Sequence, residues 1–225
     1  MKKWKLFAIA AVLVAAVVVG GTAAYLNDTE RHTDAVTLAG NLEIELLQPA
    51  WKGGATTGVQ PHQVIEKDPR ILNKSDFDVF AYLEVVMPYA DDLVLQDAAG
   101  RPVNAGAPGG PLYRYDVLDG WTLLADPSFV MDGGERRVSY VYAWMKDGAM
   151  VPLKAGEATG PLFTRVEVVN YAKATLGSRQ DLTVNAYALD AAVLRDTDPT
   201  APRTPQAMWT LLKNTYPSPS PTAQP

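Results

Sequence analysis

Short runs of β-forming residues, separated by clusters of glycine and proline, dominate this sequence after its first thirty residues. The densest run, residues 79–87, is almost entirely β-branched, aromatic or aliphatic, and we expect a central strand that stops at Pro88. Between Leu42 and Leu46, apolar residues alternate with glutamates, as in a strand with one buried face. Helical periodicity is confined to residues 204–212, where Pro205 suits a first turn. The pattern predicts an all-β sandwich with a minor helix near the C-terminus.

Other segments have the same strand character. Further strands are expected at 36–47 (a pair broken at Ala39-Gly40), 64–71 (interrupted by a turn at Lys67-Asp68-Pro69), 112–117, 121–124, 137–144, 162–169 and 182–189. Residues 97–111 are rich in glycine, proline and alanine, and we expect them to form a long loop.

The chain begins with the pattern of an export signal. Three lysines among the first five residues precede a continuous apolar run, 6–19. Small residues at Thr22 and Ala24 match the small-x-small pattern of a cleavage site, which we place between Ala24 and Tyr25. An uncleaved anchor is the alternative, because residues 6–26 are about long enough to cross a bilayer, at roughly 20 residues.

The expected organisation follows from this start. It comprises a signal peptide at 1–24, a β-sandwich domain at 25–214 and a proline-rich flexible tail at 215–225. We therefore expect a secreted protein of the extracellular matrix or cell surface, with membrane contact only through the uncleaved leader.

Composition excludes several kinds of partner and site. Without the three leader lysines, 17 basic and 25 acidic residues remain, a net charge of −8, so no basic stripe is available for nucleic acid. The chain has no cysteine, which excludes disulfides, thiolate metal sites and a cysteine nucleophile. Stability must come from a packed core, and the lack of disulfides in an exported protein is associated with Gram-positive bacteria.

No residue pattern predicts catalysis. The two histidines, His32 and His62, lie thirty residues apart in polar settings, and no His-Glu-x-x-His helix is present. The serines are not part of a Gly-x-Ser-x-Gly elbow and have no obvious neighbouring base; those considered are Ser75, Ser128, Ser139 and Ser178. We expect no catalytic residue and no enzyme activity.

The same holds for metals and cofactors. The carboxylate pairs Asp91-Asp92 and Asp196-x-Asp198 could bind a cation, but the calcium-loop pattern is missing and solvated turns are favoured. No glycine-rich phosphate loop follows a strand. The sequence therefore predicts no metal site and no cofactor.

Aromatic residues on the expected strands leave two interpretations open. They could form a glycan-binding platform or, as is more usual, fill the core of the sandwich. The residues concerned are Tyr82, Tyr140, Tyr142, Trp144 and Tyr187.

Cleavage after Ala24 would free an N-terminal segment, 25–38, that is polar and charged at first and β-prone at its end. Its most strand-like part is Ala35, Val36, Thr37 and Leu38. Such a segment could complete an exposed sheet edge of the next molecule and give an open, head-to-tail chain. An intramolecular first strand is equally compatible with the sequence.

Several segments resemble the TasA and camelysin family of exported proteins. The block 21–30, Gly-Thr-Ala-Ala-Tyr-Leu-Asn-Asp-Thr-Glu, resembles the family's signal-cleavage region. The supporting stretches are 38–44, 64–75 with its Lys-Asp-Pro triplet, 182–190 and Ala207-Met208-Trp209. The tryptophan-rich segments and the loop 97–111 resemble the clostridial branch more than TasA itself.

The resemblance implies a jelly-roll-like β-sandwich that is processed by a SipW-type signal peptidase. It also implies self-association into extracellular biofilm fibres by exchange of the freed N-terminal strand. Camelysin is described as a metalloprotease, but no zinc-ligand constellation here supports that activity. We therefore expect a secreted structural protein, with a monomeric cell-surface adhesin or glycan-binding module as the alternative.

Overall fold

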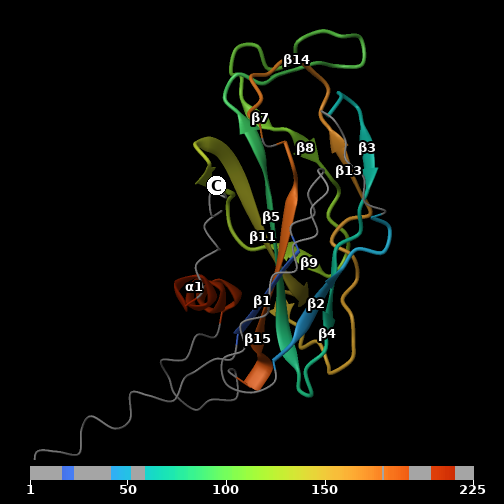
Figure 1. Ribbon diagram of the computed structural model, residues 1–225, viewed down its shortest axis with the longest axis vertical. Helices are drawn as coiled ribbons and strands as arrows, with labels where there is room; N and C mark the ends of the chain where they lie inside the picture. The colour runs from blue at the N-terminus through green and yellow to red at the C-terminus, as the bar shows by residue number, and fades with distance from the viewer. Residues whose placement is uncertain (1–16, 23–41, 52–58, 179, 193–203, 216–225) are drawn as a thin grey trace, which may run out of the picture.

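The structure is a computed structural model that describes residues 17–22, 42–51, 59–178, 180–192 and 204–215. Antiparallel strands form two packed layers, and one short helix lies against the outer face of the larger layer (Figure 1). The all-β sandwich with a minor C-terminal helix is thus confirmed.

The larger layer is an eight-stranded sheet. Its main path runs in the order β1 (Val17–Thr22), β15 (Thr183–Asp190), β5 (Val79–Ala90), β11 (Glu135–Lys146) and β10 (Ser128–Asp132). Three short strands extend it: β7 (Gly110–Pro111) pairs with β5, whereas β9 (Trp121–Leu123) and β12 (Ala149–Met150) pair with β11.

Smaller sheets form the facing layer. One contains β3 (Val64–Glu66), β13 (Arg165–Val168) and β8 (Tyr113–Arg114), and another pairs β2 (Ile44–Leu47) with β4 (Arg70–Asn73). A third pair, β14 (Tyr171–Lys173) with β6 (Val94–Leu95), lies at one end of the molecule (Figure 1).

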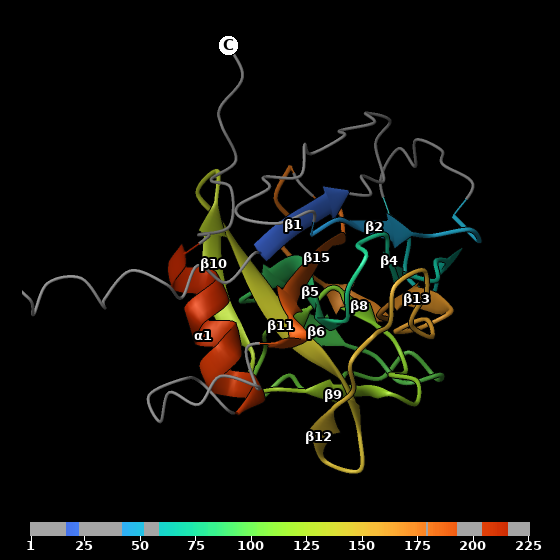
Figure 2. The same ribbon diagram turned by 90° about the horizontal axis from the view of Figure 1, so that it is seen from below.

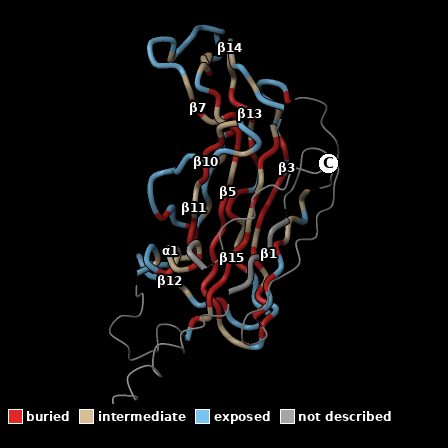
Figure 3. Tube along the Cα trace, turned by 60° about the vertical axis from the view of Figure 1, so that its left-hand side comes forward, coloured by how far each residue is buried: buried red, intermediate tan, exposed pale blue. Residues whose placement is uncertain are grey.

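The strand β5 is buried on both faces, which explains its nearly continuous apolar sequence. Val79, Ala81, Leu83 and alternate residues onward pack in the main core between the layers. Phe80 and Tyr82 face the other way, into a second core that α1 covers. Figure 3 shows β5 and β15 as the buried centre of the fold.

The helix α1 (Pro205–Thr215) lies where the sequence predicted a helix, at 204–212, and continues to Thr215. The hydroxyl of Thr204 accepts a hydrogen bond from the amide of Ala207 at 3.1 Å, and Pro205 occupies the first turn. Met208 and Leu212, four residues apart, are fully buried against the sheet. Among the described residues, no helix combines the length and apolar character needed to cross a membrane.

Two predictions about strands need correction. β5 does not stop at Pro88 but continues to Ala90, where it pairs with β7. β15 begins at Thr183, opposite Val86, so no carbonyl of β15 lies opposite Pro88 and the missing N–H of this proline breaks no ladder hydrogen bond. The carbonyl of Pro88 accepts a hydrogen bond from the amide of Leu112.

The second correction concerns β10, a strand that we did not predict. It pairs with β11 across a two-residue turn, Gly133-Gly134, where both glycines have positive φ. Its side chains are mostly exposed, so it lacks the alternating burial that marks strands of the core.

Candidate functional site: the outer edge of β15

The strand β15 has neighbours on both sides. On its inner side it pairs with β5 over eight residues, from Thr183 opposite Val86 to Asp190 opposite Val79. On its outer side it pairs with β1 over six residues, from Thr22 opposite Val184 to Val17 opposite Leu189. β1 is therefore the edge strand, and β15 is the surface to which that edge strand is added.

The register fixes which backbone groups of β15 face outward. The amide of Ala191 donates to the carbonyl of Asp78 at 3.0 Å, so odd-numbered residues of β15 direct their N–H groups toward β5. The N–H groups of Val184, Ala186 and Ala188 consequently face β1. All three side chains are fully buried in the main core, so the outer edge is a rigid row of donors and acceptors.

The strand that occupies this edge comes from the other end of the chain. β1 lies within the segment 1–24, which we predict to be a removable leader. In the view of Figure 2, it runs along β15 on the side where the large sheet meets β2. A chain without residues 1–24 would have no β1, and the outer N–H groups of β15 would need another partner.

A buried ion pair anchors the start of β15. Arg137 of β11 is 1% exposed and Asp181 4% exposed. Nη1 of Arg137 lies 3.2 Å from Oδ1 of Asp181, and Nη2 donates to the Asp181 carbonyl at 2.6 Å and to the Val86 carbonyl at 3.3 Å. The ion pair therefore fixes the residue at which β15 joins β5.

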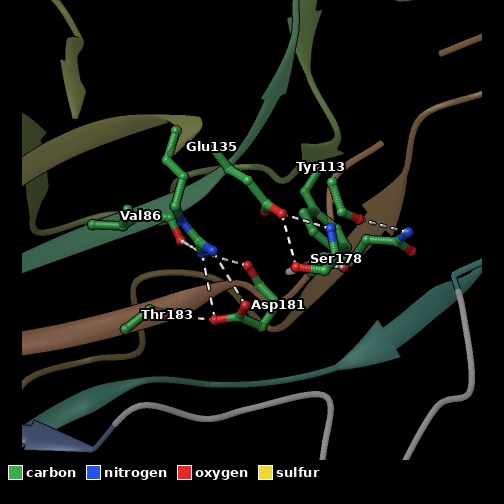
Figure 4. A network of polar contacts seen from close by, with 9 residues as sticks. Val86, Tyr113, Glu135, Ser178, Asp181 and Thr183 are labelled. Atoms are coloured by element: carbon green, nitrogen blue, oxygen red, sulfur yellow. Dashed lines mark hydrogen bonds and ion pairs between the residues drawn. The ribbon is translucent and has the colours of Figure 1, made fainter. Parts of the chain in front are cut away.

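The segment that leads into β15 is held by further contacts (Figure 4). Glu135 accepts hydrogen bonds from the amide and the hydroxyl of Ser178, at 2.6 and 2.8 Å. The hydroxyl of Tyr113 donates to the Gln180 carbonyl. The hydroxyl of Thr183 donates to Asp181 at 3.0 Å. These contacts tie β15 to β11 and to the facing layer.

Lys67 is a buried cation in the same part of the fold, 2% exposed. Its Nζ lies 4.9 Å from the centroid of the Trp51 ring. Burial lowers the pKa of Lys67 from 10.5 to about 7, and the negative charge of Asp181 opposes that shift.

A second buried charge lies in the middle of β5, on the face that α1 covers. Glu84 is 4% exposed, and Asn185 is opposite it in the β5–β15 ladder. Its Oε1 accepts from Ser139 at 2.8 Å and lies 3.4 Å from Nζ of Lys213; its Oε2 accepts from Tyr187 at 2.8 Å and from Asn185 at 3.2 Å. Burial favours a higher pKa, but Lys213 and these hydrogen bonds outweigh it and lower the pKa of Glu84.

The predicted cleavage and strand-exchange residues are not among those that the structure describes. Ala24 and Tyr25 at the cleavage site, and Ala35, Val36, Thr37 and Leu38 of the exchange segment, lie outside the described residues. The structure instead describes the edge to which such a segment could add, which the sequence had not located.

The residues considered for catalysis have structural contacts. His62 bonds to Glu167 at 3.2 Å, whereas His32 lies outside the described ranges. Ser75 bonds with the backbone of Glu43, and Ser139 and Ser178 donate to buried Glu84 and to Glu135. Within the described ranges, no group of three His, Asp or Glu side chains could hold a metal ion.

The carboxylate pairs also have partners where they are described. Asp91 contacts Arg136, and Asp92 accepts from the amide and hydroxyl of Thr175 at 2.7 and 2.8 Å. These hydrogen bonds lower the pKa of Asp92. Asp196 and Asp198 lie outside the described residues.

The aromatic residues fill the core and do not form an exposed platform. Tyr82 and Tyr187 are fully buried under α1, and Tyr142 is 4% exposed. Tyr140 and Trp144 are partly buried against the main core, where Trp144 makes an edge contact with Trp121 at 5.3 Å. The core interpretation of these aromatics is confirmed.

The sequence contains one signal for the buried charges. Glu84 interrupts an otherwise apolar strand, at a position that shares its face with Phe80 and Tyr82. A charge at such a position requires partners from other elements. The identity of those partners depends on tertiary pairing, which a single sequence does not reveal.

Comparison with known proteins adds no relative: no family model, no curated protein and no solved structure matches this chain.

Proposed function

We propose that this protein is a secreted structural subunit that assembles into surface or biofilm-matrix fibres by strand addition to the outer edge of β15. The observation that carries the proposal is the pairing of β15 with β1, a strand from the predicted leader. Removal of residues 1–24 would vacate this edge and, in the same step, free residues 25–38 as a new N-terminus.

Backbone hydrogen bonds supply most of the recognition in strand addition. The outer N–H groups of Val184, Ala186 and Ala188 alternate with inward ones, so an incoming antiparallel strand needs only regular extended backbone. Val36 and Leu38 are two residues apart and would share the face that covers the main core. The segment 35–38 therefore has the character that this edge requires.

Exchange between molecules gives a fibre because the donor and the acceptor are different surfaces of one subunit. Each molecule offers one segment and one edge, so the contact is heterologous and need not close. The resemblance to the TasA and camelysin family and the absence of a described metal cluster fit a structural role.

Three versions of the chain test the proposal. The first is the full chain, the second starts at Tyr25, and the third starts at Asn41 and lacks the donor segment. We expect filaments by electron microscopy only from the second, because only this version has both a vacant edge and a donor. A peptide of residues 25–38, added in excess, should shorten those filaments by occupying free edges.

Filaments from the chain that starts at Asn41 would overturn the assignment of the donor. A chain from Tyr25 that stays monomeric across pH and concentration would overturn the proposal as a whole.

A further inference from the structure

The group around Glu84 places an amine and a carboxamide on opposite oxygens of one buried carboxylate. Nζ of Lys213 lies 3.4 Å from Oε1 of Glu84, and Nδ2 of Asn185 donates to Oε2 at 3.2 Å. The three residues come from α1, β5 and β15, which are distant in sequence. From this geometry we propose that Lys213 and Asn185 form an intramolecular amide bond, with Glu84 transferring the proton, and that this bond joins α1 covalently to β15.

The surroundings fix the position of the Lys213 amine. Nζ of Lys213 lies 5.8 Å from the ring centroid of Tyr187 and 5.4 Å from that of Trp209. Tyr187 is fully buried, and Glu84 is 4% exposed. These cation–π contacts hold Nζ of Lys213 beside Glu84.

Glu84 is placed to act as both base and acid. It first takes a proton from the Lys213 ammonium, which frees the nitrogen lone pair. Hydrogen bonds from Ser139 and Tyr187, both at 2.8 Å, fix the carboxylate between its two reaction partners. Fixed positions of this kind replace a bimolecular encounter between amine and amide, which is slow in solution.

The step balances without an oxidant, a reductant or a cofactor. Nζ of Lys213 attacks Cγ of Asn185, so that the Nζ–Cγ bond forms and the Cγ–Nδ2 bond breaks. Nδ2 leaves as ammonium, which carries the protons that Lys213 loses by way of Glu84. Glu84 ends as a carboxylate, and the protein loses the mass of one ammonia.

The amide bond would give this chain a covalent cross-link between distant segments. The chain has no cysteine and so cannot form a disulfide. An amide bond between residues 185 and 213 closes the segment that leads from the sheet edge to the helix, and it does not depend on redox conditions. Because a cross-link of this kind restricts the unfolded chain, it should raise the melting temperature. The inference does not depend on fibre assembly.

Intact-mass measurement of the full chain, followed by peptide mass spectrometry, tests the proposal. We expect most molecules to be lighter than their sequence by one ammonia, and a digest to contain peptides of β15 and α1 joined through Lys213 and Asn185. Lys213→Arg keeps the positive charge beside Glu84 but has no nucleophilic amine, and Glu84→Gln keeps the shape but cannot accept the proton. Both variants should have the full sequence mass.

Lys74→Arg is the matched control. Lys74 pairs with Glu43 and Glu45 on the surface, and this variant should keep the ammonia loss. Lys213→Arg should also melt about 10 °C lower than the wild type, as expected for loss of one cross-link in a domain of this size.

Two results would overturn the proposal. One is a folded wild-type chain of full mass with no joined peptide. The other is an ammonia loss that persists in Lys213→Arg, because that result would indicate a cyclic imide at an asparagine and not a bond to lysine.

Discussion

The main sheet ends in two edges that are completed in different ways. At one edge, β10 is joined to its partner β11 by the two-residue turn Gly133-Gly134. At the other edge, β1 pairs with β15 although more than 160 residues separate Thr22 from Val184. A hairpin strand is a permanent part of its sheet, whereas a strand from a chain terminus can be removed or replaced.

The residues behind the two edges differ as well. The strands β5 and β11 carry buried charges whose partners lie close to β15: Glu84 of β5 with Lys213 of α1, and Arg137 of β11 with Asp181, which precedes β15. At the β10 edge the charges lie on the surface. Cζ of Arg136 is 3.8 Å from the ring centroid of Phe129, a side chain that is 50% exposed. The β15 edge is thus supported from behind by buried charge pairs, and in our proposal its outer strand is the part that is replaced.

The largest effect is expected from blocking the outer edge of β15. Ala186→Pro removes one outward N–H and places a ring where the added strand would pair, so assembly of the chain from Tyr25 should stop. The truncated monomer should keep its fold, because the bonds from β15 to β5 use odd-numbered residues. Electron microscopy and circular dichroism measure the two properties, with Ala186→Ser as the control that keeps the N–H. Filaments of Ala186→Pro at the control's yield would contradict the assignment of this edge.

A large loss of stability is expected from breaking the charge pair behind β15. Arg137→Ala leaves Asp181 buried without its main partner and should lower the free energy of unfolding by about 3–5 kcal/mol. Arg136→Ala, one residue earlier and at the β10 edge, should cost less than about 1 kcal/mol, since its contact with Asp91 is partly exposed. Urea unfolding compares the two variants. Equal losses would show that the two edges do not differ in this way.

The pH dependence of stability should reveal Lys67. Its pKa is about 7 in the folded chain and 10.5 when unfolded, so the unfolded state binds more protons between these values. Stability contributed by this group therefore rises with pH from about 7 to about 10.5 and is flat below. Lys67→Met should remove that rise and stabilise the protein at neutral pH, as measured by denaturant unfolding in a pH series. A rise that is unchanged in Lys67→Met would assign the dependence to another group.

The smallest effect is expected at the β10 edge. Phe129→Lys and Met131→Lys replace side chains that are 50% and 67% exposed, so thermal stability should change little. Because β10 is not the acceptor in our account, filaments of the chain from Tyr25 should form at the wild-type rate, followed by light scattering. A block of assembly by either substitution would move the contact surface from β15 to β10.

Local sequence was sufficient to predict most of the fold. The alternation at Leu42, Ile44 and Leu46 matches their burial, and the helix with its Thr204 cap lies where periodicity placed it. In both cases the signal lies in the segment itself. β10 was missed because an exposed edge strand shows no alternation of burial, and β5 was ended too early because Pro88 lies where no N–H is needed.

The candidate site could be predicted only in part. The sequence indicated a removable leader and a segment able to exchange, but the edge that receives a strand is a property of the sheet order. Likewise, more than 100 residues separate Glu84 from Asn185 and from Lys213 in the sequence. The three side chains meet because β5 pairs with β15 and α1 covers both strands. Such juxtapositions follow from tertiary pairing and not from local pattern.

Hydrogen exchange at the individual amides of β15 tests the central claim most directly. In the chain that starts at Asn41, the outward amides of Val184, Ala186 and Ala188 should exchange fast, whereas those of Asn185 and Tyr187, bonded to β5, should be protected. In assemblies of the chain that starts at Tyr25, all five amides should be protected. Outward amides that exchange equally fast in monomer and assembly would contradict strand addition at this edge.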